Sequence, residues 1–379
     1  GKTVWDIADK YIAQFLESME LLNIRRPDVL CRATEHINEQ IELIKKIEKN
    51  GFTYKTGVGV VFDTARFDAR RGKFGKYAEF ARLKLDKMEP GTRVEVDAEK
   101  KNPWDFLLWV TNQPEHAMLW DSPWGKGFPG WHIECTAMST KYLGEQFDIH
   151  TGGIEHIGVH HTNEIAQAWG AFGRQTANYW LHNAWVLIDG KKISKSLGNI
   201  ILVQDLATKG FEPMHLRYLF LNSHYRTGMD FSWQALAGAK TAHERLVSLI
   251  QNSNNKIQIT NQIQNSNNKI QQYQRQFSEA MSNDLNTSQA LAILWEVVKS
   301  ELNNQEKLTL VEEFDKVLGL NLLDREHATT EARKIDTETR KLMEAREEAR
   351  ENKDFITADK IREELIKKGV LVKDNPLYK

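Results

Sequence analysis

The chain has few cysteines, no long apolar run and no excess of charge of either sign. Cys31 and Cys135 are the only cysteines among 379 residues, so a disulfide framework is excluded and a reducing cytoplasm is the expected compartment. The longest apolar runs, such as Ala184–Ile188, fall far short of the roughly 20 residues of a membrane span, so we expect no membrane association. Lys and Arg number 51 against 52 Asp and Glu, so a surface that binds a polyanion must be local.

The length and the composition indicate a globular chain of more than one domain. Hydrophobic residues make up 41% and charged residues 27%, which excludes a collagen-like or wholly disordered protein. At roughly 150 residues per domain, 379 residues suggest two or three domains. No basic segment followed by an apolar core opens the chain, so no signal peptide is expected.

The spacing of apolar residues changes along the chain. Helical spacing predicts two helices in residues 1–50, the second one N-capped by Thr34. Residues 52–125 alternate short Val/Phe runs with Gly, Pro and basic clusters, which indicates an insertion with some β structure. Residues 130–202 alternate strands with helices, a rhythm typical of a parallel sheet, and residues 232–323 are almost wholly helical.

Individual elements follow from these patterns. The predicted strands are Val58–Phe62, Val94–Val96, Phe106–Val110, Phe147–His150, Trp180–Ile188 and Val370–Val372, and the predicted helices after residue 130 include Thr136–Leu143, His161–Phe172, Val203–Thr208 and Pro213–Ser223. The octapeptide QNSNNKIQ occurs at 251–258 and again at 264–271, and we interpret this duplication as an expanded linker.

Three residues could hold a metal ion. His160 and Glu164 lie at i and i+4, which places them on one face of a helix. Cys135 would open a helix, where the helix dipole lowers the pKa of a thiol. One sulfur, one imidazole and one carboxylate suit Zn²⁺, which takes four ligands. A His/Glu pair on a solvated helix is the alternative, and the spacing alone does not decide between them.

A lysine-rich loop follows the strand predicted before Asp189. Lys192 and Lys195 can neutralise the charge of a triphosphate, while Ser194 and Ser196 can donate hydrogen bonds to it. A basic surface loop without a ligand is the alternative interpretation.

Motifs around these residues resemble a known family. The loop KISKS followed by LGN resembles the KMSKS signature of class I aminoacyl-tRNA synthetases, with Ile193 in place of the usual Met. The resemblance to the cysteinyl-tRNA synthetase family rests on PGWHIECTAMS (129–139), FDIHTGG (147–153), HHTNEIAQ (160–167) and DGKKISKSLGN (189–199). It extends over essentially the whole chain through ATEHI (33–37), LRYLFLNSHYR (216–226), DLNTSQAL (284–291) and KDFITADKIREEL (353–365).

The resemblance implies a role for each matching residue. Cys135, His160 and Glu164 match three of the family's four zinc ligands, and that zinc holds the thiolate of the substrate. Trp131 and His150 match residues that line the cysteine pocket, although Trp131 could instead be a buried core aromatic.

The lysine loop matches the family's catalytic loop. Lys195 matches an ATP-binding catalytic residue, with Lys192 beside it in a mobile loop, and Ser194 and Ser196 belong to the same ATP-binding motif. His132 and His161 have weaker claims, because packing or a hydrogen bond explains them equally well.

The resemblance also implies a fold, and it shows where the chain departs from the family's pattern. We expect an α/β chain with a Rossmann-like class I catalytic domain, an inserted segment, an all-α bundle and a small C-terminal domain. The family's fourth ligand, a cysteine, and its HIGH motif precede the stretch that matches residue 1, so the resemblance implies an incomplete synthetase and excludes Cys31 as a ligand. The expected parts are 1–50 and 126–202 (catalytic domain), 51–125 (insertion), 203–240 (stem contact), 241–330 (tRNA-binding bundle) and 331–379 (C-terminal domain).

The implied function is that of a cysteine–tRNA ligase. Such an enzyme activates L-cysteine with ATP and Mg²⁺ to cysteinyl-adenylate and transfers it to tRNA(Cys), using one Zn²⁺ per chain. We expect a cytoplasmic monomer. Two alternatives stay open, namely a related ligase that joins cysteine to an amino sugar and a non-catalytic tRNA-binding paralogue.

Overall fold

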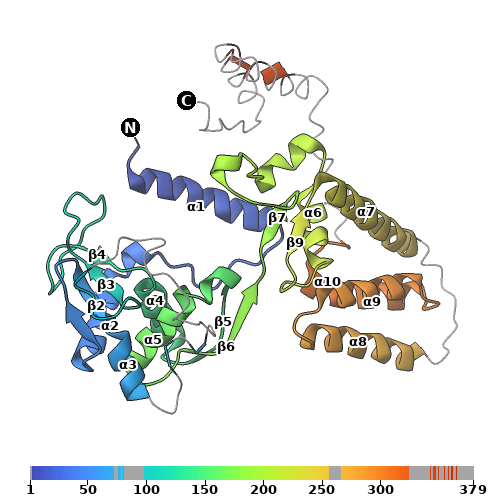
Figure 1. Ribbon diagram of the computed structural model, residues 1–379. Helices are drawn as coiled ribbons and strands as arrows, with labels where there is room; N and C mark the ends of the chain where they lie inside the picture. The colour runs from blue at the N-terminus through green and yellow to red at the C-terminus, as the bar shows by residue number, and fades with distance from the viewer. Residues whose placement is uncertain are drawn as a thin grey trace. The chain divides into compact units, whose positions relative to one another are not determined.

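The fold divides into two compact units (Figure 1). The computed structural model describes residues 2–71, 76–77, 79–80, 98–255, 266–323 and nine scattered positions between 342 and 364. The first unit comprises Gly1–Ile200, Phe220–Ala235 and Ala280–Ser288, and the second comprises Ile201–Leu219, Leu236–Glu279 and Gln289–Lys379. None of the described helices combines the length and the apolarity that crossing a bilayer requires.

Two helices open the first unit, as the sequence predicts. Helix α1 (Val4–Leu21) begins with a capping box between Thr3 and Asp6 and has no buried residue. Helix α2 (Ile37–Lys49) buries an apolar stripe against the core. The predicted N-cap at Thr34 is wrong: Thr34 lies inside the short 3₁₀ helix η1 (Ala33–Glu35), and His36 is the N-cap of α2.

An antiparallel sheet forms the first half of this unit. Its strands are β1 (Thr53–Lys55), β2 (Gly59–Phe62), β3 (Phe106–Val110) and β4 (Phe128–Pro129), in that order. Helix α3 (Thr64–Arg71) follows β2, whose four residues are all buried. The core joins α2, this sheet and α4 through Ile44, Ile47, Phe62, Leu108, Trp109 and Ile133. The β structure predicted for residues 52–125 is confirmed, while Val94–Val96 lies outside the described residues.

The second half of the unit has the expected βα rhythm. Its elements are α4 (Ile133–Leu143), β5 (Phe147–Gly153), η4 (Ile154–His156), α5 (His160–Phe172) and β6 (Ala177–Asn183), and β5 pairs with β6 in parallel. Cβ atoms added to Gly152 would meet the rings of His156 and His161 at 2.6 and 2.7 Å, so glycine lets strand β5 approach these imidazoles.

The single strand predicted over Trp180–Ile188 is wrong. It divides into β6 and β7 (Val186–Ile188), which lie in different sheets, because the backbone N–H of Ala184 donates to the carbonyl of Tyr225 at 2.7 Å and not to β5. Strand β7 pairs in parallel with β9 (Met229–Phe231) and antiparallel with β8 (Lys191–Lys192), the hairpin that carries the lysine loop.

The second unit is helical, as predicted for residues 232–323. It contains most of α6 (Pro213–Leu221), α7 (Trp233–Asn255), α8 (Ser266–Ser282) and α9 (Thr287–Lys299), and all of α10 (Asn304–Leu318). The rings of Phe277 and Phe314 stack at 4.0 Å between α8 and α10. The helix predicted near Val203–Thr208 is two short 3₁₀ turns, η6 (Val203–Asp205) and η7 (Ala207–Lys209). The strand predicted at Val370–Val372 lies outside the described residues.

Candidate active site

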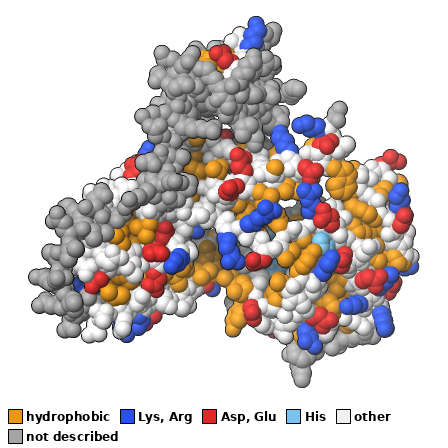
Figure 2. All heavy atoms as spheres, turned by 180° about the vertical axis from the view of Figure 1, so that it is seen from behind, with side chains coloured by type: hydrophobic (Ala, Val, Ile, Leu, Met, Phe, Trp, Pro, Cys, Tyr) orange, Lys and Arg blue, Asp and Glu red, His pale blue; other side chains and the backbone are white. Residues whose placement is uncertain are grey.

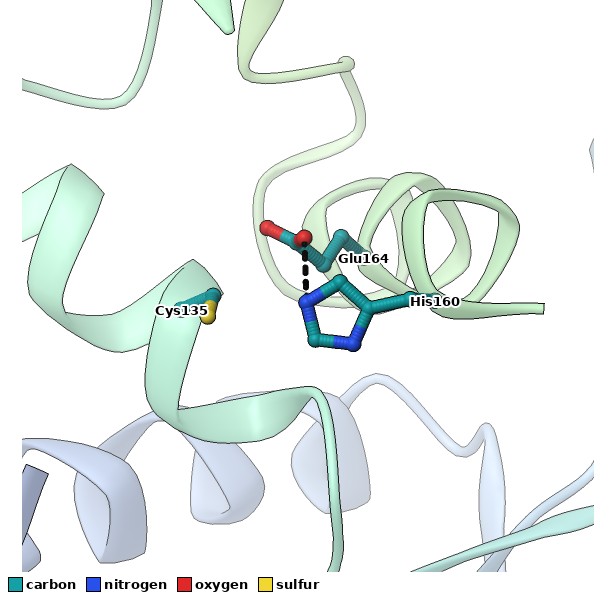
Figure 3. A group of neighbouring side chains, drawn as sticks. All are labelled: Cys135, His160 and Glu164. Carbon is teal, nitrogen blue, oxygen red and sulfur yellow. Dashed lines mark ion pairs between the residues drawn. The ribbon is translucent and has the colours of Figure 1, made fainter. Parts of the chain in front are cut away.

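Cys135, His160 and Glu164 converge on one point (Figure 3). Helix α4 supplies the cysteine as its third residue, and α5 supplies the other two from successive turns. Their ligand atoms all lie within 4.8 Å of one another. The Nε2 atom of His160 lies 3.1 Å from Oε1 of Glu164. Two ligands of one tetrahedral zinc lie about 3.3 Å apart when each bond is about 2.0 Å long, so this spacing fits a zinc ion.

The carboxylate of Glu164 lacks the partners that a buried anion needs. The side chain is fully buried, and neither oxygen accepts a hydrogen bond of good geometry. The contacts are the Nε2 atoms of His160 at 3.1 Å and His150 at 3.4 Å, both to Oε1. Burial favours the neutral acid, but these two imidazoles outweigh it and lower the pKa of Glu164 to about 2. The site therefore holds an anion that a bound cation would stabilise.

His132 contacts the imidazole of His160 and holds it in place, so the hydrogen bond that the sequence left open for His132 is made to a candidate metal ligand. The two Nδ1 atoms lie 2.6 Å apart, and His132 is buried with a left-handed backbone (φ 91°) directly before α4. Burial, with His160 beside it, lowers the pKa of His132 to about 3, so its ring stays neutral at neutral pH. Metal-binding histidines commonly use their second ring nitrogen in this way, which fixes the tautomer.

The contact between His132 and His160 determines whether Nε2 of His160 presents a proton or a lone pair to Glu164. When Nδ1 of His160 donates its proton to His132, Nε2 of His160 carries a lone pair that points at the carboxylate. A nitrogen lone pair and a carboxylate oxygen at 3.1 Å repel each other unless a proton or a metal cation lies between them. The donor set Cys, His and Glu suits zinc, so the residues fit this metal.

The expectation of a lowered thiol pKa at Cys135 is wrong. Burial raises the pKa of this thiol, and the nearby carboxyl groups of Glu164 and Glu134 raise it further. The thiol is therefore protonated at neutral pH without a cation. Cys31 belongs to neither candidate metal group; its thiol donates to Sδ of Met138 at 3.6 Å, on the same helix as Cys135.

The two predicted pocket residues lie beside this cluster. His150 comes from β5 and approaches Glu164 from the strand side. Trp131 is 61% exposed, with its ring centroid 5.0 Å from that of His132 and 5.5 Å from that of His160. The alternative of a buried core aromatic at Trp131 is therefore wrong, and its indole is accessible to a ligand.

The lysine loop is held by its own hydrogen bonds. Asn199 accepts from the backbone N–H of Ser194 at 2.9 Å and donates to the carbonyl of Lys192 at 3.0 Å, which closes the loop. The hydroxyls of Ser194 and Ser196 lie 3.2 Å apart and exposed. Lys192 ends β8 with an exposed side chain, while Lys195 begins the 3₁₀ turn η5 (Lys195–Leu197) and its side chain lies outside the described part.

The carboxylate of Glu155 interacts both with Lys192 of the lysine loop and with His156, which lies near the metal-ligand residues. Trp185 donates from Nε1 to the carboxylate of Glu155 at 2.8 Å. The pKa of Glu155 is lowered by the backbone at its own position, then by Trp185, His156 and Lys192. On the face drawn in Figure 2, Lys and Arg side chains are interspersed with Asp and Glu, as the balanced composition predicts.

Comparison with solved structures defines the fold class. Two structures of Mycobacterium tuberculosis methionyl-tRNA synthetase with methionyl-adenylate superpose with TM-scores of 0.51 and 0.53 at 15% and 14% identity. They cover 81% and 83% of this chain, which in turn covers 76% and 78% of them. The fold is that of a class I aminoacyl-tRNA synthetase, as the sequence predicts.

Sequence comparison narrows the class to one family. Residues 1–241 match the class I (C) catalytic domain of tRNA synthetases, residues 276–323 the DALR domain and residues 332–377 the cysteinyl-tRNA ligase anticodon binding domain. Cysteine–tRNA ligases of Treponema denticola and Burkholderia lata are 41% and 40% identical over 99% of this chain, which covers 79% and 76% of their lengths. The chain belongs to the cysteinyl-tRNA synthetase family.

Proposed function

We propose that the chain is a cysteine–tRNA ligase that activates cysteine with ATP and Mg²⁺ and transfers it to tRNA(Cys). The observation that carries this proposal is the convergence of Cys135, His160 and Glu164 in a chain that belongs to this family. We further propose a monomer that works in the cytoplasm, the compartment that its two free cysteines support.

The metal-ligand cluster would select the amino acid. Cys135, His160 and Glu164 would hold Zn²⁺, a borderline-soft ion that binds a thiol in preference to the hydroxyl of serine. His132 keeps the metal-facing nitrogen of His160 in place. The exposed ring of Trp131 and the imidazole of His150 would line the pocket around the substrate.

The lysine loop would bind the phosphates. The carboxylate of cysteine attacks the α-phosphate of ATP, which forms cysteinyl-adenylate and releases pyrophosphate. Lys192 and Lys195 would neutralise the charge on the leaving phosphates, and the hydroxyls of Ser194 and Ser196 would donate hydrogen bonds to them. The terminal ribose hydroxyl of the tRNA then attacks the adenylate, and AMP leaves.

The matches of the C-terminal half support tRNA as the acceptor. The DALR domain and the anticodon binding domain account for most of residues 276–377. Neither is needed to join cysteine to an amino sugar, so these matches favour the tRNA ligase over that alternative. The intact metal-ligand cluster and lysine loop favour a catalyst over a non-catalytic paralogue.

The test combines two assays on the full-length protein. ATP–pyrophosphate exchange is expected with cysteine and not with serine, and charging is expected with tRNA(Cys) and not with tRNA(Ser). Lys195→Ala should lower exchange about 10²–10³-fold, because losing one preorganised group that stabilises the transition state typically has this effect. His116→Ala, on an exposed loop, is the matched control. Exchange that does not depend on cysteine, or that Lys195→Ala leaves unchanged, would contradict the proposal.

A further inference from the structure

Glu164 takes part in a second group of metal-ligating side chains. Besides Cys135 and His160, its carboxylate lies near His150 and His161, and the ligand atoms of His150, His161 and Glu164 are also within 4.8 Å of one another. Strand β5 supplies the first of these, and α5 supplies the other two at i and i+3. The two groups share no other residue.

The carboxylate has lone pairs to spare for this second group. Both imidazole contacts of Glu164, from His150 and His160, are made to Oε1. Both oxygens are buried, and neither accepts a hydrogen bond of good geometry. A carboxylate has two oxygens and about four lone-pair sites, so one oxygen can bind one cation while the other binds a second.

The imidazoles of His150 and His161 are held in place by neighbouring rings, as the imidazoles of metal-ligating histidines usually are held by their surroundings. His161 uses Nδ1 in a 2.7 Å contact with Nε2 of His182, and in the tautomer that donates from Nδ1 its Nε2 is free to bind a metal. The ring of His150 lies 4.7 Å from that of Trp180 and 4.8 Å from that of His161, in an edge-on arrangement with the latter. Packing on both sides limits the rotation of His150, so the ligands are preorganised.

We propose that His150, His161 and Glu164 form a second site for a divalent cation of the zinc class, with Glu164 bridging the two ions. Two imidazoles and one carboxylate with an open fourth position are a ligand set that zinc adopts in enzymes. Metals that share ligands in this way lie about 3.5–4 Å apart in two-metal sites. The second site has no thiolate, so it binds a borderline-soft ion more weakly than the first and fills after it.

Binding of the second ion affects the reaction. This effect rests on the proposed function, whereas the second site itself does not. His150 lines the proposed cysteine pocket, so an ion bound to its imidazole occupies space that the substrate needs. Excess zinc is therefore a competitive inhibitor that raises the KM for cysteine and leaves the KM for ATP unchanged.

Cobalt titration of the metal-free 379-residue chain tests the second site directly. The first equivalent of Co²⁺ produces a thiolate-to-cobalt charge-transfer band from Cys135, and the second adds only weaker ligand-field absorption. His161→Phe keeps the aromatic packing and removes the ligand, so it is expected to bind one equivalent and to retain the charge-transfer band. That retained band shows that the variant is folded.

Two further variants complete the test. His156→Phe is the matched control, because the ring of His156 lies 5.0 and 5.3 Å from those of His160 and His161 but belongs to neither group. It should bind two equivalents. Cys135→Ser should lose the charge-transfer band and keep the ligand-field absorption of the second ion.

Binding of a single equivalent by the unsubstituted chain, or of two by His161→Phe, would overturn the proposal. The cobalt count does not depend on catalysis. If the chain binds two ions and the full-length protein shows no cysteine-dependent exchange, the proposed function is refuted and the second site stands.

Discussion

Replacing His132 with alanine tests how the candidate zinc site is built. The imidazole of His132 contacts Nδ1 of His160 at 2.6 Å, so its removal frees His160 to rotate and to change tautomer. Changes of this kind around a ligating histidine typically weaken metal affinity about 10–100-fold, equivalent to about 1.4–2.7 kcal/mol. We expect an effect toward the upper end of this range, because the ring nitrogen of His160 is left buried and unpaired.

The assay is competition for zinc between the chain and a chromophoric chelator of known affinity. His132→Asn is the informative second variant, because asparagine tolerates the left-handed backbone at this position (φ 91°) and its side-chain oxygen can accept from His160. It should recover part of the lost affinity. His116→Ala, in an exposed loop, should bind zinc as the unsubstituted chain does.

The thermal melt of each variant separates loss of the site from loss of the fold. An alanine variant that melts normally and binds zinc within twofold of the unsubstituted chain would refute the positioning role of His132. Equal weakening by alanine and asparagine would show that the backbone conformation matters and the hydrogen bond does not.

Three other predictions concern single side chains. Asp315→Ala should destabilise the second unit by about 1–3 kcal/mol in denaturant unfolding, because two backbone N–H groups that donate to this carboxylate at 2.7 Å lose their acceptor. A change below about 0.5 kcal/mol would contradict this prediction. Burial, with His243 beside it, lowers the pKa of His215 to about 4. Between about pH 6.5 and pH 4 the unfolded chain therefore binds a proton that the folded chain does not, so the free energy of unfolding falls as the pH falls through this range. His215→Asn should reduce the slope of unfolding free energy against pH by about one proton, and an unchanged slope would be the contrary result. Trp131→Ala should raise the KM for cysteine and not that for ATP in exchange assays, because the exposed indole lies beside the metal ligands, and an equal rise in both would argue against a pocket role.

The sequence predicts the parts of this site that depend on local geometry. His160 and Glu164 share a helix face because of their spacing, and the motifs around them identify the family before any coordinates. Strand β3 also has the predicted bounds, because a short apolar run between polar segments leaves few alternatives.

Other features depend on contacts between distant segments. The contact between His132 and His160 joins residues 28 apart and requires a left-handed backbone that no spacing rule predicts. The break between β6 and β7 depends on the carbonyl of Tyr225, about 40 residues further along the chain. The N-cap of α2 moves past Thr34 because His36 and Gln40 bond to the carbonyls of Arg32 and Ala33 and stabilise a 3₁₀ turn there.

Cys135 shows why a correct local rule can still give the wrong sign. A helix N-terminus stabilises a nearby negative charge by about 0.3–1 kcal/mol, which is less than one pKa unit. Burial in an apolar environment shifts a pKa by up to about 3–5 units in the opposite direction. The thiol lies in the first turn of α4 as predicted, but it is also buried next to two carboxyl groups, so the larger effect determines its pKa.

The same comparison supports a metal ion at the ligand cluster over a simple ion pair. Without a cation, a protonated thiol, an imidazole nitrogen of His160 and a buried carboxylate that accepts no hydrogen bond of good geometry are unfavourable neighbours. One divalent cation changes all three at once, because it ionises the thiol, accepts the imidazole lone pair and neutralises the carboxylate. Neither a proton nor a lysine side chain could do this, since each carries one charge and cannot accept three lone pairs. The unsatisfied atoms of Glu164 therefore support the metal site independently of the motif that first indicated it.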